Sequence, residues 1–250
     1  MCDKTIQSSE ASYELWLINL DRGYVMSANL NLLEAVKAGD VERVKALLEP
    51  DPTLVNARDD SGNSAVLLAA YYGRKSVVEL LLSYKPHMNL FEASAAGDLQ
   101  RLRALLGEDP DLQRDSANSF ARDGFTPLGL ASFFGHGEVV AHLLARGAEP
   151  NLASRNRMQV MPLHSAVAGR HVGIARTLLE HGADVNAAQQ EGFVPLHGAA
   201  QNGQPGMIEL LLEYGADVNP KNAEGLTALA IAVQEGHAEA AEQLRQHGAV

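Results

Sequence analysis

Short apolar stretches alternate with polar connectors along the chain, and the apolar stretches recur at a nearly constant interval. Two positions define the recurrence: an apolar residue three places before a small residue, and a leucine fifteen residues further on. The first position is held by Leu32, Val66, Leu90, Leu128, Leu163, Leu196 and Leu229. The second is held by Leu47, Leu81, Leu105, Leu143, Leu178, Leu211 and Leu244. Both series advance in the same steps, and most of these steps lie near a period of about 33 residues, which predicts a stack of similar units.

Each unit has room for two short helices and a tight turn between them. A glycine, which ends a helix easily because it tolerates positive φ, follows the first position by seven residues in six units. These glycines are Gly39, Gly73, Gly97, Gly135, Gly203 and Gly236. In the fifth unit Arg170 holds this place, directly after Gly169.

The repeated motifs resemble those of the ankyrin repeat family. The resemblance rests on Thr126-Pro127-Leu128, Met161-Pro162-Leu163-His164, Val194-Pro195-Leu196-His197, His181-Gly182-Ala183-Asp184-Val185-Asn186 and Tyr214-Gly215-Ala216-Asp217-Val218-Asn219. It implies an all-α solenoid of about seven helix pairs with short β-hairpin fingers. The repeat domain is predicted over residues 29–250, with units near 29–60, 61–86, 87–121, 122–156, 157–189, 190–222 and 223–250.

Two of the steps depart from the family pattern. The short step from Val66 to Leu90 leaves no room for a finger, so we expect a gap in the row of fingers near residues 85–89, with Pro86 in the first turn of the next helix. The long step from Leu90 to Leu128 predicts a longer connector over residues 108–120.

Residues 1–28 lie outside the repeat and form a separate N-terminal segment. Its apolar residues Tyr13, Trp16, Leu17 and Leu20 have helical spacing. This predicts a helix that caps the first unit, and the alternative is a helix that binds a partner.

Composition narrows the class of protein. The chain of 250 residues holds 37 alanines and 35 leucines but only 5% aromatic residues, a mixture that favours helices. The formal net charge of −11 argues against binding to nucleic acid. With Cys2 as the sole cysteine, and with neither a signal peptide nor a membrane-spanning stretch in view, we expect a cytoplasmic chain that does not bind membranes and is monomeric alone.

No catalytic motif is present, so the sequence predicts no enzyme, no catalytic residue, no cofactor and no metal site. The histidines follow the repeat and not a ligand spacing. The resemblance implies that His164 and His197 connect neighbouring fingers by hydrogen bonds. It places His136, His171 and His237 in the turn between the two helices of a unit.

The resemblance also implies that a partner binds on the concave face, at the finger tips and on the exposed side of the inner helices. We assign to this surface the aromatic residues Tyr71, Tyr72, Phe125, Phe133, Phe134 and Phe193. The other candidates are Arg122, Arg155, Arg157, Met158, Arg170, Gln201 and Asn202, with Gln190 and Glu191 on the same fingers.

Two features of this surface favour partner binding. Half of the twelve Tyr and Phe residues map to it, although some of these rings could instead pack between units. The segment 152–179 contains four arginines and no acidic residue, which suits a carboxylate or phosphate, although it could simply be a solvated face. Of the four, Arg176 is expected on an outer helix, pointing away.

These patterns predict a non-catalytic scaffold that binds an unidentified protein partner, through an acidic or apolar segment, in the groove between fingers and inner helices. One alternative is a small-ligand or anion-binding protein that uses Arg155, Arg157 and Arg170. The others are an enzyme with an unfamiliar site and a structural protein that self-associates through its ends.

Overall fold

The computed structural model describes residues 27–250, and the chain divides into two compact parts, an N-terminal part (Met1–His87) and a C-terminal part (Met88–Val250). The predicted N-terminal capping helix lies outside the described residues. The described part of the chain is helical, and its β pairing is limited to one isolated bridge between Arg58 and Ser64. The boundaries of the seven predicted repeats stay a prediction.

The N-terminal part holds two helix pairs. Residues 27–38 are helical and are followed by α2 (Val41–Leu48), the 3-10 helix η1 (Pro52–Asn56), α3 (Ala65–Tyr71) and α4 (Lys75–Ser83). A connector over residues 84–89 follows, without a hairpin finger. The amide N–H of His87 donates to Oδ1 of Asn56 at 2.7 Å, which fixes His87 to the end of η1.

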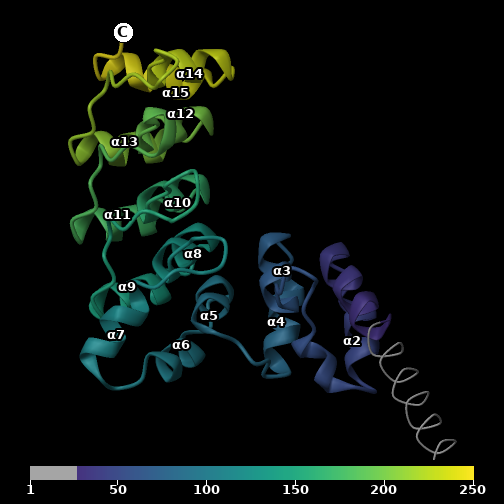
Figure 1. The fold of residues 1–250 in the computed structure, drawn as a ribbon. Helices are drawn as coiled ribbons and strands as arrows, with labels where there is room; N and C mark the ends of the chain where they lie inside the picture. The colour runs from purple at the N-terminus through teal and green to yellow at the C-terminus, as the bar shows by residue number, and fades with distance from the viewer. Residues whose placement is uncertain (1–26) are drawn as a thin grey trace, which may run out of the picture. The chain divides into compact units, whose positions relative to one another are not determined.

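The C-terminal part stacks five further helix pairs into two layers (Figure 1). The inner layer consists of α5 (Leu90–Ala96), α8 (Pro127–Phe134), α10 (Pro162–Ala168), α12 (Pro195–Gln201) and α14 (Ala228–Gln234). The outer layer consists of α6 (Leu99–Leu106), α9 (Gly137–Ala145), α11 (Val172–Glu180), α13 (Pro205–Glu213) and α15 (Ala238–Gln246). Successive inner helices contact one another, as do successive outer helices, so one continuous apolar core runs between the layers.

The inner helices begin and end where local chemistry dictates. At α8, Thr126 is the N-cap and its Oγ1 accepts the N–H of Gly129 at 3.0 Å. Pro127 follows at the first helical position, where its missing N–H costs nothing. The six predicted helix-ending glycines all have positive φ, and Arg170 has φ of 64° in the fifth unit. The turn therefore keeps its left-handed residue even where that residue is not glycine.

Side chains at the start of the outer helices connect each unit to a neighbouring unit of the stack. His136 Nε2 donates to the carbonyl of Ala95 at 2.9 Å, His171 Nε2 to Phe133 at 3.1 Å, and His237 Nε2 to Gln201 at 3.0 Å. Arg74 and Gln204 make the corresponding bonds to Lys37 and Val167. Since the carbonyls at the end of a helix lack partners within it, these bonds satisfy exposed acceptors and fix the spacing of the units.

A second series of hydrogen bonds runs along the loops that follow the outer helices and α7. In each case the Nδ2 group of an asparagine donates to a glycine carbonyl of the next unit. Its Oδ1 atom accepts the backbone N–H of the residue two places after that glycine. Asn151, for example, donates to Gly182 at 2.9 Å and accepts from Asp184 at 2.8 Å. The other asparagines of the series are Asn118, Asn186 and Asn219. The recurrent Asn of the sequence motif therefore has a defined structural role.

In two outer helices, the leucine at the second repeated position is not the buried leucine of the helix. Leu47 is only partly buried and Leu105 is 36% exposed, whereas Leu48 and Leu106 are 0% and 4% exposed. The buried leucines near the ends of the outer helices are Leu48, Leu81, Leu106, Leu143, Leu178, Leu211 and Leu244. In this corrected series the short step, from Leu81 to Leu106, is one residue longer than in the predicted series. The long step, from Leu106 to Leu143, is one residue shorter, so both steps lie slightly closer to the regular period.

Two local predictions are also corrected. Pro86 does not lie in the first turn of a helix, because α5 begins four residues later behind a capping box in which Asn89 and Glu92 bind each other's backbone N–H. The long connector over residues 108–120 contains a further helix, α7 (Pro110–Ala117). Asp109 caps this helix by accepting the N–H groups of Asp111 and Leu112.

The corrected register can be tested within one helix. Leu106→Ala should lower the free energy of unfolding by about 2 to 5 kcal/mol, because it leaves a cavity in the apolar core. Leu105→Ala should cost less than about 1 kcal/mol, because that side chain is partly exposed. Urea unfolding of both variants measures the difference, and equal losses would contradict the assignment.

A second prediction concerns the close approach of adjacent units. Gly236→Ala should lower the free energy of unfolding by about 1 to 2 kcal/mol. A Cβ atom there would meet no other atom, so the positive φ is the source of the strain. Gly135→Ala should cost at least about 1 kcal/mol more, because its Cβ would lie 2.5 Å from Cε1 of His171 and displace the ring from the Phe133 carbonyl. Thermal unfolding of both variants compares them; a smaller loss for Gly135→Ala would disprove the packing argument.

Candidate functional site

The fingers of the C-terminal part are tight turns, and in each of them a backbone hydrogen bond joins the first residue to the last. We number the fingers after the repeat units that they begin. The backbone N to O distances of the closing bonds are 2.8 Å in finger four (residues 121–125), 2.9 Å in finger six (189–193) and 3.1 Å in finger seven (222–226). Finger six also contains the short 3-10 helix η2 (Gln190–Gly192). Finger five (residues 154–160) closes at 2.9 Å and is two residues longer. This extra length explains why the step from Leu128 to Leu163 exceeds the step that follows it.

Backbone hydrogen bonds also join each finger to the next. The N–H of Arg155 donates to Gly124 at 2.9 Å, that of Gln190 to Met158 at 3.1 Å, and that of Ala223 to Glu191 at 2.8 Å. Fingers four to seven therefore form one connected row. A surface held in this way is largely formed before any partner arrives.

A hollow of about 380 Å³ lies where fingers five and six meet the end of α12. We call it the notch; it is lined by Met158, Gln189, Gln190, Glu191, Phe193 and Gln201. Met158 is 54% exposed, and Phe193 is partly buried, with its ring centre 5.1 Å from that of His197. The notch thus combines apolar walls with side-chain amides, and Glu191 is the one ionisable group of its lining.

The predicted aromatic residues divide between the two parts of the chain and differ in exposure. Tyr71 and Tyr72, at the end of α3 in the N-terminal part, are 43% and 51% exposed. In the C-terminal part, Phe133 is 42% exposed and packs edge to face against the partly buried Phe134, with ring centres 5.1 Å apart. Phe125 is also partly buried. Three of these rings are therefore largely exposed, and the others serve at least partly in packing.

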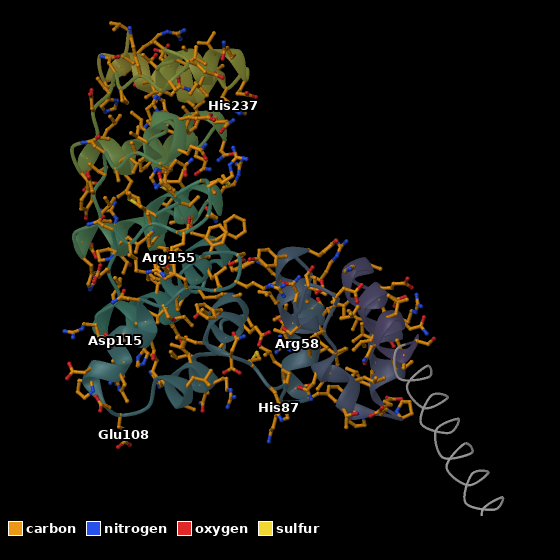
Figure 2. All side chains as sticks on the ribbon, in the orientation of Figure 1. Arg58, His87, Glu108, Asp115, Arg155 and His237 are labelled. Carbon is orange, nitrogen blue, oxygen red and sulfur yellow. The ribbon has the colours of Figure 1, made fainter. Side chains whose placement is uncertain are left out.

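The predicted arginines have different surroundings. Arg122 is exposed on finger four. Arg155, which is labelled in Figure 2, has its Cζ atom 3.9 Å from the centre of the Phe120 ring, so its guanidinium lies over that ring. Arg157 is exposed and makes no hydrogen bond or ion pair with any residue in the described part of the chain. Arg170 donates to the carbonyl of Asn202 at 2.8 Å and so connects two units.

Arg176 lies on the outer helix α11, as expected, and pairs with Glu213 at 3.2 Å. This pair and its hydrogen bonds raise the pKa of the Arg176 guanidinium. Arg176 therefore does not belong to the finger surface. Of the remaining candidates, Gln201 is exposed at the end of α12 and Asn202 is partly buried as its C-cap.

Sequence reasoning missed two contributors to this surface. Gln189 lines the notch but lies just before the residues that the repeat pattern assigns to a finger tip. Phe120 supports Arg155 from the connector before finger four, where no motif marks it. Both are placed by contacts between neighbouring units, which the spacing within one unit does not reveal.

The five repeat histidines have structural partners. His197 accepts the N–H of Val194 at Nδ1 and donates from Nε2 to the Pro220 carbonyl at 3.0 Å. His164 donates from Nε2 to the Phe193 carbonyl at 3.2 Å. Burial lowers the pKa of His164 to about 4 and also lowers the pKa of His197. Across residues 27–250, no group of three His, Cys, Asp or Glu side chains is placed to hold a metal ion.

Comparison with protein families agrees with the repeat architecture. Family models described as ankyrin repeats match residues 32–82, 90–189 and 178–232. The chain belongs to the ankyrin repeat family. Ankyrin repeats are generally modules of protein–protein interaction, and the family is typically non-catalytic. In the described part of the chain, no helix combines the length and apolar character that crossing a membrane requires.

Individual relatives are similar only over part of their length. The chain is 39% identical over 126 residues to the rat (Rattus norvegicus) ankyrin repeat and SAM domain-containing protein 6, covering 50% of this chain and 11% of that protein. It is 32% identical over 165 residues to the Neurospora crassa ankyrin repeat protein nuc-2, covering 62% and 15%. It is 30% identical over 158 residues to the Bos taurus mitochondrial disaggregase, covering 60% and 23%. The chain thus matches less than a quarter of the length of each.

The buried histidines predict that stability falls in mild acid. The folded state holds His164 neutral down to a pKa of about 4, whereas the unfolded chain takes up the proton near pH 6.5. The unfolded state therefore binds more protons as the pH falls below 6.5, at a cost of about 2 kcal/mol between pH 7 and pH 5. Urea unfolding at the two pH values measures this loss.

His164→Gln is the control for this titration, because glutamine keeps an N–H donor but does not titrate. Its loss of stability between pH 7 and pH 5 should be smaller than that of the unaltered chain by about 2 kcal/mol. An equal loss in both proteins would show that His164 is not the titrating group.

Proposed function

We propose that this chain binds a polypeptide segment on the finger surface of its C-terminal part, with the notch as the anchoring point. The observation that carries the proposal is the notch itself, which is about 380 Å³ in volume and has Met158, Phe193 and Gln201 in its lining. Apolar walls beside amide groups suit a peptide, because its side chains need apolar cover and its backbone needs hydrogen-bond partners.

The connected row of fingers supports this function. Because Gln190 is tied to Met158 through the backbone, two walls of the notch cannot separate freely. Binding then requires little rearrangement, and the entropy lost on association is correspondingly smaller. The exposed ring of Phe133 on α8, two inner helices away along the stack, offers a further contact for a segment that extends along the row.

The alternative function, binding of a small ligand or anion by Arg155, Arg157 and Arg170, has less support. None of these arginines lines the notch. The guanidinium of Arg170 is engaged with the Asn202 carbonyl, so the three cations do not share a single role. A non-catalytic scaffold in the cytoplasm, monomeric when alone, remains our expectation for the whole chain.

Met158→Glu tests the notch. It places a charge on an apolar wall and should weaken capture of a partner polypeptide from an extract of the source cell by at least about tenfold. Leu112→Glu is the control, because Leu112 lies on α7 and is similarly exposed, at 62% against 54% for Met158. Both variants are first compared with the unaltered chain by thermal unfolding, so that a loss of capture is not a loss of fold.

Affinity capture followed by mass spectrometry measures the result. A protein retained by the unaltered chain and by Leu112→Glu but lost with Met158→Glu supports the proposal. Equal retention by all three, or loss only with Leu112→Glu, would place the interface elsewhere.

A further inference from the structure

The tips of fingers four and five are joined at two points. Besides the backbone bond from Arg155 to Gly124, Nδ2 of Asn156 donates to the carbonyl of Asp123 at 3.2 Å. The Oδ1 atom of Asn156 accepts the N–H of Met158 at 3.1 Å, which stabilises the turn within the same finger. Asn156 therefore holds the tip of finger five in a fixed position between finger four and the notch.

Two cationic side chains flank Asn156, and they differ in how they are held. The guanidinium of Arg155 lies over the ring of Phe120, with Cζ 3.9 Å from the ring centre. Stacking of this kind leaves the N–H groups at the edge of the guanidinium free to bind an anion. Arg157 has no partner in residues 27–250. Arg155 and Arg157 thus offer two sets of N–H donors at the tip of finger five, and the donors of Arg155 are oriented before an anion binds.

The acidic groups around this tip limit where positive potential can develop. Asp123 lies on finger four, where its Oδ1 accepts the N–H of Phe125 at 3.2 Å, and Arg122 stands beside it. Glu191 lies on finger six and lines the notch. From residue 150 to residue 179 there is no acidic residue. In a chain with net charge −11, finger five thus lies in a segment whose charged residues are all arginines.

The geometry points to a partner segment that carries an acidic residue bound by Arg155 and Arg157, with an apolar residue close to it in sequence seated in the notch. This inference rests on the proposed function, and it specifies the partner's chemistry. A carboxylate matches the paired N–H groups of a guanidinium, and the apolar neighbour matches Met158 and Phe193. An acidic side chain does not suit the notch itself, because Glu191 lines it and would repel a second carboxylate.

Arg170 is excluded from the anion site, although its sequence position suggests membership. Its Nη2 atom is occupied by the carbonyl of Asn202, and the residue occupies the left-handed turn after α10. Arg170 occupies the position where the other six units have glycine, and its side chain connects two units. We therefore assign the binding of the anion to finger five.

The test is selection of peptides from a displayed library of short random sequences on the folded full chain. Selected peptides should be enriched in Asp or Glu close to a large apolar residue. Their affinities are then measured by fluorescence anisotropy with the unaltered chain and with variants. Arg157→Ala should raise Kd by at least about fivefold, and Arg155→Ala/Arg157→Ala by at least about tenfold.

Two variants serve as controls. Arg176→Ala removes the same charge from the outer helix α11 and should change Kd by less than about twofold. Arg157→Lys keeps the charge but loses the paired donors, so its Kd should fall between those of the unaltered chain and Arg157→Ala.

The other results have distinct meanings. Selected peptides without acidic residues, or peptides whose Kd is the same for Arg155→Ala/Arg157→Ala and the unaltered chain, would overturn the inference. If such peptides still lose affinity with Met158→Glu, the proposed function stands without the anion site. If selection yields no peptide that binds the chain, both proposals fail.

Discussion

Every helix pair in this protein has an apolar face that only a neighbouring pair can cover, and this requirement governs the rest of the structure. Leu143, Leu178 and Leu211 are completely buried because each lies between successive units. Once packing has set the distance between units, hydrogen bonds can form between neighbouring units, both at the starts of the outer helices and in the loops. The histidines at the starts of the outer helices and the asparagines in the loops make these bonds at regular intervals. Apolar burial supplies the stability, and the polar series fix the alignment of one unit with the next.

The finger row inherits its order from this stack. The fingers are short turns with few backbone hydrogen bonds inside them, and finger six contains one short 3-10 helix. They are held by bonds to neighbouring fingers, and finger five differs by being longer and by carrying Arg155, Asn156 and Arg157 at its tip. A two-residue insertion in one unit therefore creates a local feature on an otherwise repetitive surface. The notch beside it depends on the same irregularity, because Met158 belongs to the longer finger.

The sequence predicted the repeat and the helix-ending glycines, because each leaves a mark within a single unit. The place of the histidines in each unit followed from the resemblance to the ankyrin repeat family, but the carbonyls that His136, His171 and His237 bind did not. It failed where two neighbouring residues satisfy the same local pattern. Leu47 and Leu48 are equally good leucines for a helix, as are Leu105 and Leu106, and only contact with the next unit selects the buried one. The length of the connector does not predict the helix α7, although Asp109 and Pro110 form an ordinary start signal for it. Neither the notch nor the support of Arg155 by Phe120 could be predicted, since both join residues from different units.

The central claim is that a polypeptide partner contacts finger five and the notch. The most direct measurement is site-specific photo-cross-linking in an extract of the source cell. A photoreactive residue replaces Met158 in one protein and the similarly exposed Leu112 in another. The account predicts a cross-linked polypeptide with the probe at position 158 and none in common with the probe at position 112. A partner captured from position 112 alone, or the same products from both positions, would contradict it.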